Sequence, residues 1–268
     1  MSAIPGRFYI CVLGVAIIFT IGRTDAAEDP ANRPSTPSPA PLEVTLQALG
    51  GARFALGKVV LDKDQRLVSF PAVINQREGL VEYVVVTTQG KTHESVWRTD
   101  AEPKHIHLAM LLLGAKPAST PFNPPDYFFQ LPPGERVTLE AVWRIGGGEV
   151  RRPLEEFVIT TNNMRRLPPG PWIYNGSFVH GGLFVAQRDG SIVALKVDAC
   201  ALINNPRLGR ENENLYCVNT PALPPDGVAV ELAIRLPPAI SPPSADPSTS
   251  PPAARDGAAG PPSPVVPP

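Results

Sequence analysis

Residues 78–114 read EGLVEYVVVTTQGKTHESVWRTDAEPKHIHLAMLLLG, and this stretch decides the expected fold. It predicts a strand over Leu80–Thr88, a two-residue turn at Gln89 and Gly90, and a second strand over Thr92–Trp97. Alternating side chains would place Glu82, His93 and Ser95 on one face of this hairpin, because Glu82 then faces Trp97 across the strands. We therefore expect three polar groups to stand on an otherwise apolar surface.

A helix is predicted directly after the second strand. Thr99 and Glu102 have the spacing of a capping box, Pro103 falls in the first turn, and Gly114 is placed to end the helix. Between Ile106 and Leu113 only His107 interrupts the apolar residues, so the helix over Pro103–Leu113 should be buried on more than one side.

Outward from this stretch, alternating patterns separated by turn residues predict a mainly β fold, of the β-rich α+β class, with antiparallel sheets and one buried helix. Breaks at Pro117–Pro125 and Leu167–Pro171 divide it into pieces 42–116 and 117–236, which form one domain or two. The other candidate strands are Arg53–Leu61, Arg66–Val73, Arg136–Ile145, Glu149–Val158, Leu183–Gln187, Ser191–Val197, Leu215–Val218 and Val228–Arg235.

Both ends of the chain have compositions that do not suit a packed core. Residues 1–26 read as a cleavable secretory signal, with Arg7 before an apolar run over Phe8–Ile21. The alternative, an uncleaved anchor, is disfavoured because the run is shorter than the ~20 residues of a spanning helix. A linker over 27–41 and a tail over 237–268 are rich in proline and are predicted to be disordered. The chain is thus expected to be exported, to the periplasm or the outside, without an integral membrane segment after cleavage.

Charge and cysteine content limit the partners and cofactors. The net charge is −1 and no block of Lys or Arg occurs, so nucleic acid and anionic membranes are not indicated as partners. Cys200 and Cys217 are the two cysteines of the chain after the signal. They predict a disulfide in an oxidising compartment, and the alternative is two unpaired thiols packed as small apolar groups.

The motifs resemble those of a known family. Residues Gly79–Ser95 follow a pattern "G-[LIV]-[LIV]-E-Y" and then "G-K-T-H-E-S" before an apolar helix, and this resembles the YdjY-like domain of secreted bacterial proteins. A weaker likeness continues through "Y-N-G-S-F" from Tyr174 and "D-x-x-A-L-I-N" from Asp198 to Asn204. The resemblance implies no established activity, and Cys200 departs from the family pattern.

The hairpin residues admit two interpretations. In the functional one, His93 is a base or metal ligand oriented by Glu82, and a shift of one residue in register brings Glu94 beside Glu82. In the structural one, which we favour, Glu82, His93 and Ser95 are a hydrogen-bonded cluster that holds the hairpin against the helix. His93→Ala should then destabilise the fold, and His105→Ala, on the exposed side of the helix, should not. Lys91 is included with Glu82, His93, Glu94 and Ser95 in the candidate polar cluster, although its simplest interpretation is a turn residue.

Other candidates are weaker, and no cofactor is predicted. His105 and His107 are about 200° apart on a helix, so one divalent metal cannot easily bind both. Ser177, near His180–Gly182, lacks the spaced glycines of a serine hydrolase, and Asn175 is a further candidate beside it. A carboxylate and amide cluster could bind calcium but is more simply a solvated loop; its members are Asp198, Asn204, Asn205, Glu211 and Glu213.

The sequence as a whole favours an exported, non-catalytic module of the cell envelope that binds a ligand or protein which the sequence does not name. The alternative is a metal-assisted hydrolase with a site at Glu82, His93 and Glu94. The metal content of the isolated protein would separate the two functions.

Overall fold

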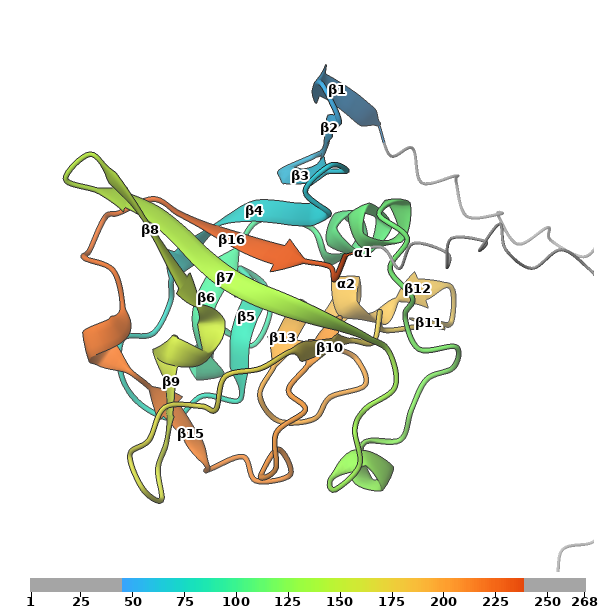
Figure 1. Ribbon diagram of the computed structural model, residues 1–268. Coiled ribbons are helices and arrows are strands. Elements are labelled where there is room, and N and C mark those ends of the chain that lie inside the picture. The colour runs from blue at the N-terminus through green and yellow to red at the C-terminus, as the bar shows by residue number, and fades with distance from the viewer. Residues whose placement is uncertain (1–44, 239–268) are drawn as a thin grey trace, which may run out of the picture. The chain divides into compact units, whose positions relative to one another are not determined.

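The computed structural model describes residues 45–238, which form a mainly β fold with few helices, as predicted (Figure 1). The predicted signal, the linker and all but the first two residues of the predicted tail lie outside these residues. Neither α-helix within 45–238 is long and apolar enough to span a bilayer.

Eight strands hydrogen-bond in a closed ring, because the strand at one end of the order also pairs with the strand that begins it. Three neighbouring strands of this ring come from before Pro117 and the other five come from after it, so one sheet joins both halves of the sequence. In order around the ring they are β4 (Leu67–Ile74), β16 (Val230–Arg235), β7 (Glu135–Ile145), β10 (Trp172–Tyr174), β14 (Ile203–Asn204), β13 (Ser191–Ala194), β5 (Tyr83–Thr87) and β6 (Ser95–Thr99).

Further strands are attached to the ring or stand beside it. A ribbon extends from β4 through β3 (Val59–Asp62) and β2 (Arg53–Leu56) to β1 (Leu46–Gly50), and β8 (Gly148–Pro153) pairs with β7. Two separate pairs complete the strands: β9 (Val158–Thr160) with β15 (Tyr216–Val218), and β11 (Val179–His180) with β12 (Leu183–Phe184). Figure 1 shows β1 and β2 standing above β3, away from the ring.

The predicted hairpin is wrong, because β5 and β6 are parallel. Tyr83 pairs with Ser95 and Val85 with Trp97, while the other side of β5 is antiparallel to β13. Every residue of β5 is buried. An unbroken run of apolar residues is what a strand needs when both its faces and both its edges are covered. Parallel neighbours commonly need a crossover of a dozen or more residues. Here residues 88–94 suffice, because Thr92–Glu94 form a 3-10 turn instead of a strand.

Helix α1 (Pro103–Leu112) confirms the predicted helix and its start at Pro103, but its capping and its burial differ. Glu102 is the N-cap residue without a side-chain cap, and Thr99 ends β6, where its hydroxyl binds the carbonyl of Pro71 at 2.6 Å. Pro103, Ile106, Ala109 and Met110 are buried, whereas Leu111 and Leu112 are 42% and 43% exposed. The helix therefore packs along one side, against β3 and β4.

Three strand predictions need correction in detail. The predicted strand Arg53–Leu61 is two strands, because Gly57 adopts a positive φ of 56° that allows a tight turn between them. The second half of Glu149–Val158 is a 3-10 turn over Leu154–Phe157. Leu183–Gln187 is mostly helix α2 (Val185–Asp189), which ends at left-handed Gly190. The remaining 3-10 turns cover Pro124–Tyr127 and Thr220–Ala222.

Candidate functional site

The structure separates the three residues predicted to share a hairpin face. Ser95 is fully buried, and its N–H donates to Gln76 Oε1 at 3.0 Å. The His93 side chain is 80% exposed, and its Nε2 lies 3.7 Å from Glu94 Oε2. Glu82 lies 3.7 Å from Lys196 Nζ. His93 is thus not a partner of Glu82, and the predicted cluster of Glu82, His93 and Ser95 does not form.

Glu82 nevertheless has an unusual environment. Burial raises the pKa of its carboxyl, the neighbouring charge of Glu94 raises it further, and Lys196 opposes both. Lys196 also binds Glu213 at 2.7 Å, so one ammonium group serves two carboxylates. Within residues 45–238 no three His, Cys, Asp or Glu side chains are placed to hold a metal ion together.

Lys91, interpreted from the sequence as a turn residue, instead joins a polar cluster around Asp198. The Tyr83 hydroxyl donates to Asp198 Oδ2 at 2.9 Å, and Lys91 Nζ binds the same hydroxyl and lies 3.8 Å from that carboxylate oxygen. The ammonium group also stands 4.5 Å from the centre of the Tyr83 ring. Burial, followed by the charge of Asp198, raises the pKa of Tyr83.

The secondary candidates from the sequence extend this cluster. Asn204 is fully buried: its Oδ1 accepts the Asp198 N–H at 2.7 Å, and its Nδ2 donates to the Asp198 carbonyl at 2.8 Å and to Asn175 Oδ1 at 2.9 Å. Ser177 Oγ donates to the carbonyl of Cys200 at 2.7 Å. We call this set the motif network, and its members are Tyr83, Lys91, Asn175, Ser177, Asp198, Cys200 and Asn204.

The predicted disulfide is wrong, since Cys200 and Cys217 are both unpaired. Cys200 belongs to the turn after Asp198, where its N–H donates to Asp198 Oδ1 at 2.8 Å. Cys217 lies in β15, opposite Ile159 of β9. Burial raises the pKa of the Cys200 thiol to about 12, and the charges of Asp198 and Asp189 contribute. The thiol is therefore protonated at neutral pH and is a poor nucleophile.

The two helix histidines have different neighbours, as their angular separation predicts. His107 Nδ1 lies 2.8 Å from the Tyr174 hydroxyl, and its ring is 5.0 Å from that of Phe184. The His105 side chain is only 13% exposed, so its predicted exposed position is wrong. A Cβ added to Gly57 would lie 2.8 Å from His105 Nδ1, which shows how closely the ring packs on that turn.

The carboxylate and amide groups considered for calcium are used separately. Asn205 Nδ2 donates to the Leu195 carbonyl at 3.1 Å and to the Tyr216 hydroxyl at 3.0 Å, while Glu213 pairs with Lys196.

The residues considered for a serine hydrolase are also apart in their roles. Ser177 Oγ accepts the Ala186 N–H at 3.1 Å, and His180 is exposed in the short β11–β12 hairpin. The main chain thus uses the polar atoms of Asn205 and Ser177.

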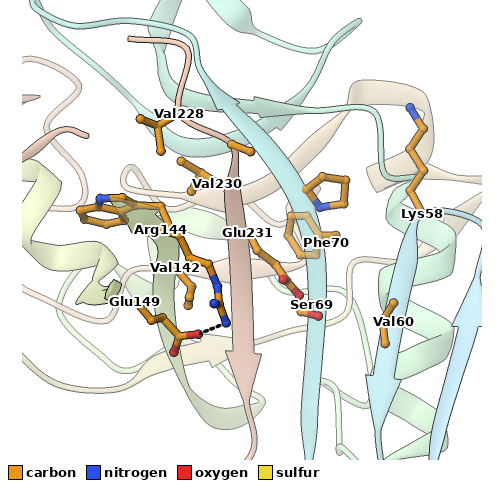
Figure 2. Close-up of a pocket in the computed structure, with 13 residues that line it drawn as sticks. Lys58, Val60, Ser69, Phe70, Val142, Arg144, Glu149, Val228, Val230 and Glu231 are labelled. Atoms are coloured by element: carbon orange, nitrogen blue, oxygen red, sulfur yellow. Dashed lines mark ion pairs between the residues drawn. The ribbon is translucent and has the colours of Figure 1, made fainter. Parts of the chain in front are cut away.

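A hollow of about 650 Å³ opens on the outer side of the ring, across β3, β4, β16 and β7 (Figure 2). We call it the outer groove. Its apolar lining includes valines from three strands, and a second hollow of about 430 Å³ shares Lys58 and Pro71 with it. The lining residues are Lys58, Val60, Ser69, Phe70, Pro71, Val142, Trp143, Arg144, Glu149, Val228, Ala229, Val230 and Glu231.

The charges of the outer groove are arranged unevenly. Arg144 lies 3.7 Å from Glu149 at one side, and Lys58 binds Asp100 at 2.9 Å. Glu231 projects from β16 between these two walls in Figure 2, and no ion pair involves it within residues 45–238. The sequence did not single out this groove, because its residues come from distant strands; only the outward position of Glu231 in the alternating segment VELAIR could have pointed to it.

The sequence was compared with models of known protein families, with curated proteins and with solved structures. The family model of the YdjY domain matches residues 59–235, which is more than half of the chain. The chain belongs to the YdjY domain family. No curated protein and no solved structure gives a significant match.

The family match covers the whole motif network of this YdjY domain, and all of the outer groove except Lys58. The likeness of the three motifs, which the sequence places far apart, has a structural counterpart: Lys91, Asn175 and Asp198 belong to one network. Strands β1 and β2 precede the matched residues.

Proposed function

We propose that this YdjY domain is a non-catalytic binding module of the cell envelope, and that the outer groove receives an extended peptide segment of a partner protein. The signal predicted over residues 1–26 supports an envelope location. The main support for a binding role is the outer groove. A hollow of about 650 Å³ with apolar walls and few polar groups has the size and lining of a binding site.

The charges of the groove favour a peptide with a basic side chain. Glu231 presents a carboxylate with no ion pair among residues 45–238, while the guanidinium of Arg144 already faces Glu149. A Lys or Arg of the partner would complete a charge-assisted hydrogen bond with Glu231, and its neighbours would pack on Val60 and Val142.

The motif network supports binding rather than chemistry. Asp198 accepts from the Tyr83 hydroxyl and from the Cys200 N–H, and the Cys200 thiol is held protonated. A nucleophile or base must instead be free to exchange a proton with a substrate. The alternative metal site would need Glu82, His93 and Glu94 to hold one ion together, and no three His, Cys, Asp or Glu side chains of residues 45–238 are placed to do so.

Selection of displayed random peptides on the exported chain tests the proposal. Enriched peptides should contain Lys or Arg, and Glu231→Lys should weaken their binding about tenfold or more, as measured by calorimetry. Glu78→Lys is the matched control, because Glu78 is an exposed carboxylate outside the groove. Equal affinities for Glu231→Lys and the wild type would reject the groove as the site. Stoichiometric transition metal in the isolated protein would favour the hydrolase.

A further inference from the structure

The sheet leaves two strands with a single neighbour, and their exposed edges differ. Within residues 45–238, β1 pairs only with β2, and β8 pairs only with β7. Each edge presents backbone N–H and C=O groups that can pair with another strand. Natural sheets protect such edges with charged residues, proline or a covering segment.

Strand β8 carries this protection. Its sequence GEVRRP includes Glu149, Arg151 and Arg152 and ends at Pro153. Arg151 binds Glu140 at 3.2 Å and Glu149 at 3.0 Å, so a second strand would have to displace an ordered set of charges. Pairing at this edge is therefore disfavoured.

Strand β1 lacks the first two of these devices, charge and proline, although its pairing with β2 is irregular between Ala48 and Gly50. Residues 45–52 read TLQALGGA, without charge or proline, and all five residues of β1 are exposed. Leu46 is 44% and Leu49 45% exposed. Because the edge is neutral, two copies of it can approach across a twofold axis without like-charge repulsion.

We infer that β1 is a self-association edge, at which two copies of this chain pair their β1 strands antiparallel. The partner is a second copy because an antiparallel pair of identical strands is self-complementary, and the neutral sequence of β1 fits itself. The ring then continues through the β3–β2–β1 ribbon into the same ribbon of the other copy. This interface is separate from the outer groove and does not depend on the proposed function.

Sedimentation equilibrium of the full exported chain tests the inference. The wild type should change from monomer to dimer with rising concentration. Ala48, at the centre of β1, is exposed, so Ala48→Lys and Ala48→Glu should fold normally. Each variant alone should dimerise roughly tenfold more weakly than the wild type, because like charges meet across the axis. An equal mixture of the two should restore dimers, as opposite charges then face each other.

Ala229→Lys is the control, because it places the same charge on an exposed alanine of the outer groove. It should dimerise as the wild type does. A wild type that stays monomeric at every concentration would overturn the inference. So would an Ala48→Lys variant that dimerises as tightly as the wild type, or dissociation caused by Ala229→Lys instead.

Discussion

The motif network and the outer groove differ in how their polar groups are used. In the network, buried Asn204 makes three hydrogen bonds and Asp198 accepts from both a hydroxyl and an amide. In the groove, Glu231 is exposed and stands between walls whose charged groups, Lys58 and Arg144, already have partners. Hydrogen bonds that are complete inside the fold stabilise it, while groups left open to solvent are available to a partner. The conspicuous motif residues therefore build the scaffold, and ordinary strand residues form the surface we propose for binding.

The largest effect is expected from Asn204→Ala. The substitution leaves the Asp198 N–H, the Asp198 carbonyl and the Asn175 amide oxygen without their partner in a buried place. The free energy of unfolding should fall by about 3 kcal/mol. Denaturant unfolding measures it, with Asn214→Ala as the exposed control. A loss as small as that of the control would show that the network does not hold the fold.

The next comparison is between two histidines. His105→Ala removes a ring that packs on the Gly57 turn and should cost about 1–2 kcal/mol. His93→Ala should change the stability by less than about 0.5 kcal/mol, because the side chain is largely in solvent. This order reverses the one expected from the sequence. Equal denaturant midpoints for the two variants would contradict it.

A smaller, pH-limited effect is expected from His107, which lies beside the motif network. Burial lowers its pKa, so below about pH 6.5 the unfolded chain binds more protons than the folded chain. This contribution to stability is complete above that pH and is lost as the pH falls through the lower folded pKa. His107→Asn should therefore flatten the fall in stability between neutral and acidic pH, measured by unfolding at several pH values. His93→Asn should leave it unchanged; the same slope in all three proteins would refute the assignment.

The smallest effect on stability should come from the groove. Glu231→Lys should change the free energy of unfolding by no more than about 0.5 kcal/mol, since its carboxylate is exposed and outside any ion pair within residues 45–238. Thermal or denaturant unfolding checks this. A loss similar to that of Asn204→Ala would make Glu231 a structural residue and erase the contrast between the two regions.

Much of the element content was predictable. Proline in the first turn predicted the start of α1, and alternation in VELAIR and in the segment around Val142 predicted β16 and β7. The short strands β10 and β14 were missed, because three and two residues carry no measurable period. The Gln89–Gly90 turn was misassigned because the uninterrupted Val84–Val86 run indicates burial on both faces, which a two-stranded hairpin cannot provide.

For the candidate sites, the sequence indicated which residues belong to the polar network, but it did not indicate which of them are in contact. Asn175, Ser177, Asp198 and Asn204 were candidates from their motifs, but the contacts that Tyr83 and Lys91 make with Asp198 each cross more than 100 residues of chain. The two cysteines, 17 positions apart, could have paired on spacing alone, and their placement in a turn and in β15 leaves both as thiols. Pairing depends on the positions and directions of the Cβ atoms, which the fold decides.

What the sequence by itself determined is local: the mainly β class, the helix after Pro103, and the family to which the motifs belong. The side-chain period, the geometry of proline and the order of residues in a motif depend only on residues close together in the sequence. They can therefore be recognised without the tertiary structure. The closed ring, the parallel β5–β6 pair, the motif network and the outer groove were decided only by the tertiary structure. They arise when strands distant in sequence bury a shared core and complete each other's hydrogen bonds, so no local pattern encodes them.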